Sequence, residues 1–578
     1  MTSAYDRYRA ADSDLPDAAW AWLLHGAGEE NMGRDGAPEL VAIPEPDADH
    51  MLVRIDSVGL CFSDVKITRQ GGSHPKLYNR DLSKDPTRLG HEVSLTVIEV
   101  GDNLKDRYHP GQRLAVQPDI YQDGRSTAYG YTIPGGLIQY HLMGSEMLET
   151  DDGACLLPLP DTMGYAEAST LEPWGCVMAA YTQRRRLEPK AGGTMWIVGR
   201  PGDERDYLFS SGLDAPATVV MTDVPDSVAK LVEGTSATTV VRDGLDADDY
   251  QALVDELTDG AGFDDIVVLD PRSASMVGAV ATHIARRGTL NLVGETELDG
   301  LVDTDVGRLH YDYTAYLGNR GPDIAASYGE ARNRCDLRSE GTTVFVGAGG
   351  PMGLMHVQRA IQQPGGPRTI VATEVSDERL KALEDRLAHL AESNDCELIT
   401  VNSQTSEQSL RDFVMDLTDG RGADDVVVSV PIASVMAEAD TLMRSDGMLV
   451  FFAGVPNGTM APMNLSAVYL DNAQYTGTSG LTIHDQQQVV DLATQGALSP
   501  GSIVGAVGGM RAAKDGLQAL VEGRYSGKVL IFPQIHDLPL MGLHELKETL
   551  PEVAEKLGPG DTWNGEAERA LFESQLSR

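Results

Sequence analysis

Basic residues are scarce in this chain of 578 residues: 46 Lys and Arg face 87 Asp and Glu, which leaves a formal net charge of -41. The acidic residues are dispersed rather than gathered in one tail. Because nucleic acids and anionic membranes would be repelled by such a surface, the composition argues against both as partners. Two explanations of the acidity stay open: a salt-adapted cytoplasm, where ionic strength screens the self-repulsion, or an ordinary acidic protein.

Long apolar runs and paired cysteines are also missing. No stretch of about 18 apolar residues occurs, so we expect no membrane span. Residues 1–20 are polar and acidic, which is not the pattern of a signal peptide. The five cysteines are scattered at no disulfide-like spacing, which fits a reducing compartment. We therefore expect a cytoplasmic protein.

The pattern of apolar, proline and glycine residues in the sequence changes near residue 190. Before that point, short alternating runs such as 51–56 and 93–100 are separated by proline and glycine, which predicts a β-rich domain. After it, apolar strands alternate with helices, the βαβ pattern of a doubly wound parallel sheet. The length suits about two to four domains.

This pattern of alternating strands and helices occurs twice in the sequence. The segment 257–268 recurs as 417–428, with the same Leu-Thr-Asp-Gly start and an Asp-Asp pair before an apolar strand. Four further landmarks recur in the same order, about 150 to 160 residues apart. The paired landmarks are 196–199 with 345–347, 219–223 with 371–374, Pro271 and Met276 with Pro431 and Met436, and 288–294 with 447–454. The repetition predicts two tandem Rossmann-like units.

Three short segments far apart in the chain carry the residue types of a zinc site. Cys61 begins a Cys-Phe-Ser-Asp run, His91 and Glu92 follow a glycine, and Glu172 lies between leucine and proline. Thiolate, imidazole and carboxylate are ligands of catalytic zinc, which keeps one position open for water or substrate. No two of these segments are close enough to suggest a zinc finger. Only a folded domain brings them together, which is typical of catalytic metal sites.

These segments, with the run 111–116, resemble the zinc-dependent medium-chain dehydrogenases over residues 20–535. The Leu-Glu-Pro run at 171–173 is similar to the sorbitol- or polyol-dehydrogenase-like branch, in which Glu stands where other alcohol dehydrogenases carry Cys. Within that branch, the chain resembles the long subgroup of sugar-alcohol and sugar-phosphate dehydrogenases. The resemblance implies an α/β fold class: a GroES-like β-rich catalytic domain plus a doubly wound Rossmann domain. This chain departs from it by an inserted second tandem Rossmann-like unit.

We accordingly predict four regions. They are a GroES-like zinc catalytic domain (1–190), a degenerate Rossmann-like unit (191–335), an NAD-binding Rossmann domain (336–480), and a return to the catalytic domain with a helical extension (481–578). The relatives carry four closely spaced cysteines for a second, structural zinc, whereas 117–142 contains none. We therefore expect one zinc per chain.

The resemblance also assigns roles around the zinc. Cys61 and His91 are implied as ligands, and Asp64 matches the carboxylate that hydrogen-bonds the ligand histidine and fixes its tautomer. Glu92 and Glu172 both match glutamates that approach the zinc. The sequence leaves open which of the two binds directly and which holds the zinc-bound water.

A proton relay is implied beside the metal. Ser63 matches the hydroxyl that passes the alcohol proton onward. Lys66 stands where many relatives place a relay histidine, and it could shuttle protons only with a depressed pKa. Lys66 alternatively binds a ribose or an anionic substrate, and His74 is a second candidate for the relay.

A glycine-rich turn follows an apolar strand in the second unit. Its glycines are Gly347, Gly349, Gly350 and Gly353. They permit a tight turn and let the backbone approach a pyrophosphate on the helix N-terminus. Glu374, 21 residues after Gly353, ends the next apolar run, where a carboxylate accepts hydrogen bonds from a ribose diol and repels a 2′-phosphate. The pattern favours NAD over NADP, with nearby Arg379 as the contrary sign.

The first unit keeps only part of this pattern. Gly199 and Gly202 are present, but Asp203 stands near the expected pyrophosphate, while Asp223 occupies the ribose position. We interpret it as a degenerate copy. A second nucleotide site or a wall that shapes the substrate pocket stays an alternative.

The leading hypothesis is a zinc-dependent oxidoreductase that moves a hydride between NAD(H) and a secondary alcohol of a polyol, sugar or sugar phosphate. The alternatives are an NADPH-dependent alcohol or aldehyde reductase, a non-catalytic dinucleotide-binding protein, and an epimerase with tightly held NAD. The resemblance further implies a homo-oligomer.

Overall fold

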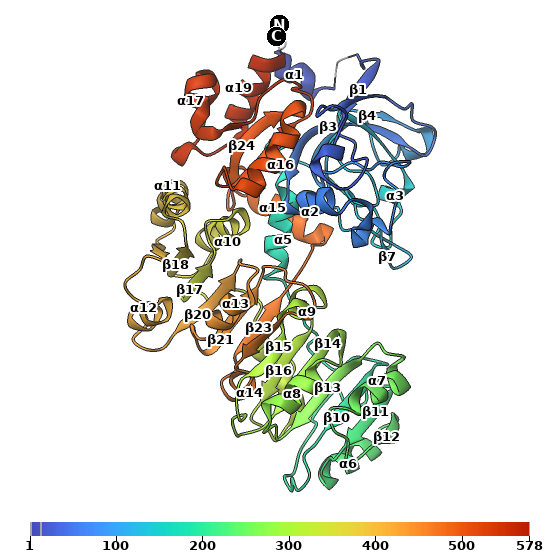
Figure 1. The fold of residues 1–578 in the computed structure, drawn as a ribbon, viewed down its shortest axis with the longest axis vertical. Coiled ribbons are helices and arrows are strands. Elements are labelled where there is room, and N and C mark those ends of the chain that lie inside the picture. The colour runs from blue at the N-terminus through green and yellow to red at the C-terminus, as the bar shows by residue number, and fades with distance from the viewer. Residues whose placement is uncertain (1–2, 12–13, 577–578) are drawn as a thin grey trace.

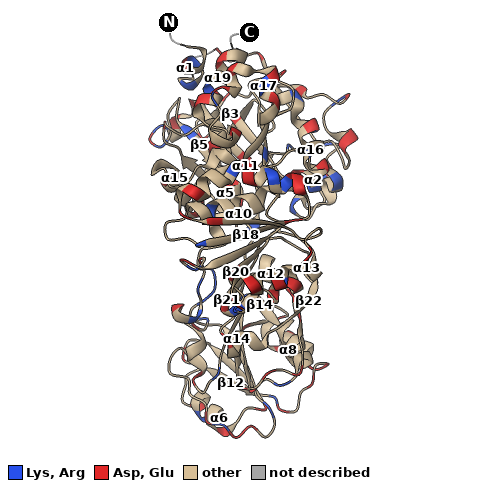
Figure 2. Cartoon of the chain, turned by 90° about the vertical axis from the view of Figure 1, so that its left-hand side faces the viewer, with Lys and Arg blue, Asp and Glu red and all other residues tan. Residues whose placement is uncertain are grey.

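The computed structural model describes residues 3–11 and 14–576. The chain forms an elongated molecule (Figure 1), with the β-rich N-terminal part and the C-terminal segment at one end and two α/β units in a row beyond them. Acidic residues occur along its whole length (Figure 2). Among the described residues, no helix has the length and apolar character needed to cross a membrane.

The first part is built on an eight-stranded sheet that uses both halves of the chain. Its strand order is β26-β24-β25-β3-β4-β5-β9, with β8 paired to β3. The strands are β3 (Met51–Leu60), β4 (Glu92–Val100), β5 (Arg113–Val116), β8 (Tyr140–Met143), β9 (Leu156–Pro158), β24 (Val504–Gly509), β25 (Lys528–Phe532) and β26 (Met541–Gly542). β25 runs antiparallel to β3, with Val529 opposite Leu60. The C-terminal segment therefore closes the sheet next to the first metal-ligand candidate.

The two ends of the described chain pack together (Figure 1). Helix α1 (Ala4–Arg9) contacts α19 (Gly565–Leu576), and the short helices α17 (Leu546–Thr549) and α18 (Pro551–Ala554) lie beside them. Glu568 of α19 is fully buried and accepts hydrogen bonds from the N–H groups of Tyr165 at 2.8 Å and Ala166 at 2.7 Å, where helix α4 (Tyr165–Ser169) begins. The Glu568 carboxylate thus fixes the C-terminal extension to the N-terminus of α4 in the β-rich part, where negative charge is favoured.

Residues 194–477 contain two six-stranded parallel sheets with one topology. The strand orders are β12-β11-β10-β13-β14-β16 and β19-β18-β17-β20-β21-β23, the doubly wound order 3-2-1-4-5-6. The first sheet has β10 (Thr194–Val198), β11 (Thr218–Thr222), β12 (Thr238–Val241), β13 (Phe263–Leu269), β14 (Ile284–Val293) and β16 (Ala315–Asn319). The second has β17 (Thr342–Val346), β18 (Thr369–Glu374), β19 (Glu397–Asn402), β20 (Ala423–Val428), β21 (Met443–Phe451) and β23 (Gln474–Gly477). The predicted α/β class is confirmed.

The two units differ in the helix after their first strand. In the second unit, α10 (Pro351–Gln362) connects β17 to β18; in the first, the described residues between β10 and β11 form no helix. The remaining helices correspond in order. They are α6 (Asp226–Glu233), α7 (Tyr250–Thr258) and α8 (Ala274–Ala281) in the first unit, and α11 (Asp377–Ser393), α12 (Leu410–Leu417) and α13 (Ala433–Asp440) in the second.

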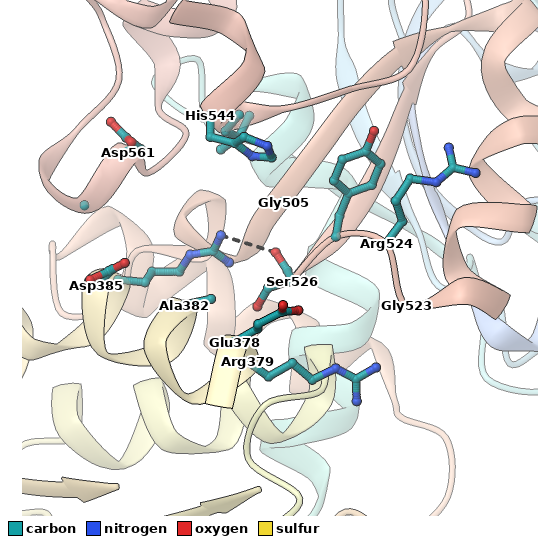
Figure 3. A pocket seen from close by; sticks show the side chains of 14 residues that line it. Glu378, Arg379, Ala382, Asp385, Gly505, Gly523, Arg524, Ser526, His544 and Asp561 are labelled. Carbon is teal, nitrogen blue, oxygen red and sulfur yellow. Dashed lines mark hydrogen bonds between the residues drawn. The ribbon is translucent and has the colours of Figure 1, made fainter. Parts of the chain in front are cut away.

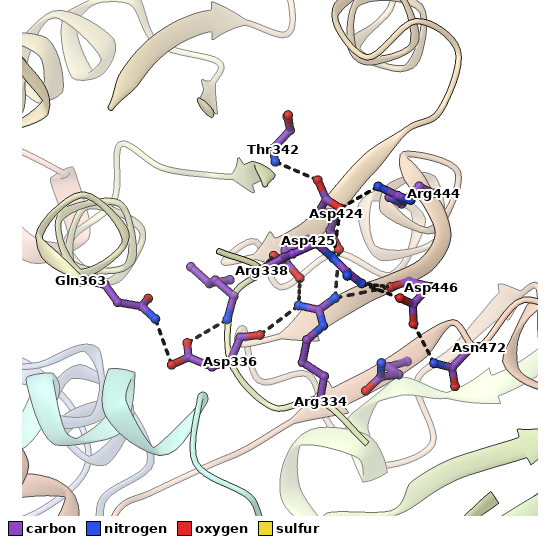
Figure 4. Close-up of polar contacts among 12 residues, drawn as sticks. Arg334, Asp336, Arg338, Thr342, Gln363, Asp424, Asp425, Arg444, Asp446 and Asn472 are labelled. Carbon is purple, nitrogen blue, oxygen red and sulfur yellow. Dashed lines mark hydrogen bonds and ion pairs between the residues drawn. The ribbon is translucent and has the colours of Figure 1, made fainter. Parts of the chain in front are cut away.

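Both units repeat one set of ion pairs where the chain enters the sheet. In the second unit, Arg334 pairs with Asp425 and Arg338 pairs with Asp424 (Figure 4). Asp424 also accepts the N–H of Thr342 at 2.9 Å. The equivalent contacts in the first unit are Arg186 with Asp265, Lys190 with Asp264, and the Thr194 N–H with Asp264. The repeated Asp-Asp pair therefore anchors the first strand of each sheet.

The two units meet through matching elements. Strand β15 (Val302–Asp305) pairs antiparallel with β22 (Met460–Met463), so that Val302 faces Met463 and Asp305 faces Met460. Helix α9 (Val306–Tyr311) of the first unit packs on β23, and α14 (Ser466–Leu470) of the second packs on β16. Each unit thus offers the other the same kinds of element, as in a two-fold interface between identical subunits. The edge strands β16 and β23 lie beside each other inside this contact.

Candidate active site

Cys61 and Asp64 lie at the junction of β3 and helix α2 (Phe62–Gln70). Cys61 is the N-cap of α2, and one carboxylate oxygen of Asp64 accepts its N–H at 2.9 Å, as in a capping box. The other oxygen accepts the N–H of Gly90 at 3.0 Å. Asp64 therefore ties the start of α2 to the loop that presents His91.

Cys61, His91 and Glu92 come together in the folded chain. Their possible ligand atoms, the Sγ, a ring nitrogen and a carboxylate oxygen, all lie within 4.8 Å of one another. His91 and Glu92 are buried and Cys61 is half-buried. Gly59 faces Glu92 across the β3–β4 pair, and a Cβ there would lie 2.1 Å from Glu92 Oε2, so this glycine makes room for the carboxylate. The ring of Tyr131, centred 5.8 Å from the His91 ring, covers one side of the cluster.

The polar atoms of this cluster fit a zinc ion. Glu92 Oε2 and His91 Nδ1 are buried and have no hydrogen-bond partner among the described residues, although Nδ1 lies 3.7 Å from Asp64 Oδ1. An unpaired buried polar atom costs about 1–3 kcal/mol, which coordination to a cation would offset. Sulfur, nitrogen and oxygen donors in one set suit zinc. Cys61, His91 and Glu92 are therefore the residues that would hold it.

Lys528 belongs to this site, and the sequence analysis missed it. Its Nζ lies 2.5 Å from Glu92 Oε1, with both side chains buried. Burial opposes a charged lysine, but the charges of Glu92 and Cys61 raise the pKa of Lys528 above its usual range. Burial also opposes ionisation of Cys61, yet His91 and Lys528 lower the pKa of that thiol to about 7. The cluster thus favours the thiolate, which is the metal-binding form.

The glycine-rich turn of the second unit joins β17 to α10 as predicted. Gly347 has φ +82°, and a Cβ on Gly353 would lie 2.2 Å from the Gly347 carbonyl oxygen. A Cβ on Gly349 would lie 2.6 Å from Oε2 of Glu374, the buried last residue of β18. Gly350, the N-cap of α10, faces open space. The turn, the helix N-terminus and the carboxylate form the cradle expected for a pyrophosphate and its adenosine ribose.

Comparison with known proteins agrees with this geometry. Residues 47–150 match the alcohol dehydrogenase GroES-like domain, and residues 351–495 match the zinc-binding dehydrogenase domain. The chain is 25% identical over 543 residues to mannitol-1-phosphate 5-dehydrogenase of Aliivibrio fischeri, covering 92% of this chain and 93% of that one. It is 27% identical over 309 residues to L-sorbose 1-phosphate reductase of Klebsiella pneumoniae, covering 50% of this chain and 73% of that one.

The chain belongs to the zinc-dependent medium-chain dehydrogenase family. It is accordingly an oxidoreductase that works with zinc and a nicotinamide cofactor. Among solved structures, AibC has a TM-score of 0.51 at 15% identity, covering 89% of this chain and 96% of that one, and shows the fold alone.

Glu172, the second glutamate candidate, lies next to the cluster of Cys61, His91 and Glu92 but is not part of it. It lies in the first turn of helix α5 (Leu171–Ala179), is 9% exposed, and accepts a hydrogen bond from Cys176 Sγ at 3.6 Å. The set of ligand atoms within 4.8 Å contains Glu92 and not Glu172. The geometry therefore groups Glu92 with the two other ligand candidates, and direct ligation by either glutamate stays a prediction.

Two of the three predicted relay residues, Ser63 and His74, lie next to Tyr131. Ser63 Oγ lies 3.5 Å from Cys61 Sγ, and the His74 ring is centred 5.5 Å from that of Tyr131. Lys66 is exposed on α2. Burial and the charges of nearby lysines, Lys66 among them, lower the pKa of His74, so its ring is neutral and able to accept a proton. The roles of Ser63, Lys66 and His74 stay predictions.

The glycine turn of the first unit has a different structure. Asp203 is held by Arg205 at 3.0 Å, and Arg200 pairs with Asp270 at 2.5 Å. No helix starts after Gly199 before β11 among the described residues. This turn therefore offers no helix N-terminus to a pyrophosphate.

Replacing Asp64 by asparagine should weaken zinc binding about 10- to 100-fold, the usual effect of losing a partner of a metal ligand. Both carboxylate oxygens of Asp64 accept backbone N–H groups, from Cys61 and Gly90, so an asparagine would set its NH2 against one of them. Competition with a chromophoric chelator measures the affinity. Unchanged affinity in Asp64→Asn would show that Asp64 does not position the ligands.

Proposed function

We propose that this chain oxidises a secondary alcohol of a polyol, sugar or sugar phosphate to the ketone, and reduces the ketone in the reverse direction, with NAD(H) and one zinc ion. The proposal rests on the buried Cys61, His91 and Glu92 cluster. The substrate class is supported by the names of relatives that act on mannitol 1-phosphate, L-sorbose 1-phosphate and D-arabitol phosphate.

Each residue at the proposed substrate site has a separate role in the reaction. A bound zinc supplies Lewis-acid polarisation of the substrate oxygen. Asp64 holds the loop that carries His91, and Ser63 accepts the alcohol proton and passes it toward His74. A bound nicotinamide would supply the hydride acceptor, so the alcohol would lose one hydride and one proton overall. The turn before α10 fixes the cofactor by its pyrophosphate.

Elemental analysis of the natively purified chain tests the metal part of this function. We expect about one zinc per chain, together with NAD reduction when mannitol 1-phosphate or sorbitol is supplied. A folded protein that was never exposed to a chelator and contains no zinc would overturn the mechanism. It would favour a non-catalytic dinucleotide-binding role instead.

The carboxylate of Glu374 is proposed to select NAD over NADP. Hydrogen bonds to a charged group contribute about 1.5–3 kcal/mol, so Glu374→Gln should lower kcat/KM for NAD roughly 10- to 100-fold and leave NADP unaffected or improved. Glu392→Gln, on the exposed face of α11, is the matched control. A parallel loss with both cofactors would mean that Glu374 is needed for the fold of the turn and not for selection.

The first unit is proposed to bind no dinucleotide, within the boundaries predicted from the sequence (191–335). Its turn lacks a helix N-terminus, and Asp203 adds a negative charge there. Fluorescence titration should give one NADH per chain. Two equivalents would restore the alternative of a second nucleotide site.

A further inference from the structure

A cavity of about 340 Å³ lies between the cofactor-binding unit and the C-terminal segment (Figure 3). One wall is a face of α11 that carries Arg379, Ala382 and Arg386. The facing wall consists of the loop 523–526, just before β25, and of residues from the C-terminal extension, including His544. Volumes of about 300–1,000 Å³ are typical of small-molecule sites.

The deepest charged group of this cavity is Arg386, which is only 9% exposed. Its Nη2 donates to the Ser526 carbonyl oxygen at 3.3 Å, while Nη1 has no partner among the described residues and would lie 2.7 Å from a Cβ on Gly527. Burial lowers the pKa of Arg386 to about 10, and no carboxylate offsets this effect. A buried cation without a counter-charge is costly, so this position favours an anion from outside the chain.

The carboxylates of the cavity do not neutralise the charge of Arg386, because they lie at the rim of the cavity. Asp385 is paired with Lys381 at 2.6 Å and is 60% exposed, and Asp561 is paired with Lys547 at 2.7 Å and is 45% exposed. Glu378 is exposed at the start of α11. The negative groups are therefore solvated or already neutralised, whereas the positive group is buried and unpaired.

Arg379 and Arg524 add guanidinium groups nearer the opening. Arg379 carries no ion pair among the described residues, and its Nη2 would lie 2.5 Å from a Cβ on Gly523. Arg524 is tied to Asp515 and Glu522. Guanidinium is the protein group best suited to the planar, two-point binding of a phosphate. Tyr525 offers an aromatic ring to the rest of a ligand.

We propose that this cavity binds a small metabolite through its phosphate group, which contacts Arg386. Arg379 lies at the glycine turn, since a Cβ on Gly349 would lie 2.8 Å from the Arg379 Cβ. Arg386 is seven residues further along α11, or about 10 Å of helix, so the phosphate position is distinct from the turn. A ligand here touches both the cofactor-binding unit and the segment that closes the catalytic sheet. Its binding is therefore coupled to any movement between these two parts.

The test uses the full chain saturated with NADH, so that the cofactor site is filled, and inorganic phosphate as the probe. Phosphate should raise Tm at constant ionic strength, with chloride as the comparison salt, and calorimetry should give one site per chain. Ala382→Glu places a carboxylate four residues before Arg386, where it pairs along the helix. This variant should have a higher Tm without phosphate and a phosphate affinity reduced at least tenfold.

Ala382→Gln is the matched control and should bind phosphate as the parent chain does. Arg386→Gln should lose the increase in Tm with phosphate. If Arg386→Gln does not fold, the comparison of Ala382→Glu with Ala382→Gln still tests the proposal, because both substitutions are compatible with a helix. Equal phosphate affinity in Ala382→Glu and Ala382→Gln would overturn the proposal, as would a parent chain that shows no binding. Because neither readout is activity, this result is independent of the proposed dehydrogenase function.

Discussion

Cys61→Ser should lose its zinc and about a thousand-fold of its activity. The thiolate is the soft ligand of the cluster, and its pKa of about 7 already favours the ionised form. Zinc supplies several kcal/mol of transition-state stabilisation, and about 1.4 kcal/mol corresponds to a factor of ten. Elemental analysis and kcat/KM, measured on the same preparation, follow metal and activity together.

The matched control for this loss is Cys396→Ser, which changes a half-buried cysteine outside the cluster. It should keep the zinc and the activity of the parent chain. If Cys61→Ser retained one zinc per chain with full activity, the cluster would not be the catalytic metal site. Thermal unfolding checks that both variants are folded.

Lys528→Met should lower the free energy of unfolding of the metal-free protein by about 3–5 kcal/mol, the usual cost of removing one partner of a buried ion pair. The ammonium lies 2.5 Å from Glu92, and the two side chains are 5% and 1% exposed. The loss should shrink as pH falls, because protonation of an unpaired Glu92 removes the buried charge. Urea unfolding at pH 5 and pH 8 measures both effects.

The double variant Lys528→Met with Glu92→Gln separates charge from packing. It leaves no buried charge at this position, so it should recover most of the stability lost in the single variant. If the single variant were as stable as the parent chain, Lys528 and Glu92 would not form an ion pair in solution. If the double variant stayed as unstable as the single one, packing of the lysine stem would be the cause.

Local patterns were sufficient for most elements of the fold. The predicted strands at 51–56 and 93–100 are confirmed within β3 and β4. The repeated landmarks correspond to strands and anchoring aspartates, because side chains that must be buried or ion-paired restrict the sequence most. The pairing of β15 with β22 could not be predicted from a sequence pattern, since it depends on how two distant segments pack. The missing helix after β10 was likewise not predicted.

Some residues of the candidate site could likewise be predicted from the sequence, and others could not. Cys61, His91, Glu92 and the glycine turn could be proposed from the sequence, because metal and pyrophosphate chemistry demands particular residues at particular spacings. Lys528 and Arg386 were missed, since a single lysine or arginine in the sequence looks like any surface cation. Only burial and the presence or lack of a carboxylate partner distinguish them. A lysine that opens the apolar strand β25 was the one available sign.

The two-fold-like contact between the α/β units has a consequence for how this chain can change. When two identical subunits meet, every substitution enters the interface twice; here the two faces are encoded separately and can diverge. The second unit keeps the glycine turn and Glu374, while the first keeps the packing elements β15 and α9 without a comparable turn. Because both halves share one backbone, their association does not depend on protein concentration. If only the second unit binds the cofactor, as proposed above, a division of labour between a cofactor-binding half and a supporting half is fixed in a single polypeptide.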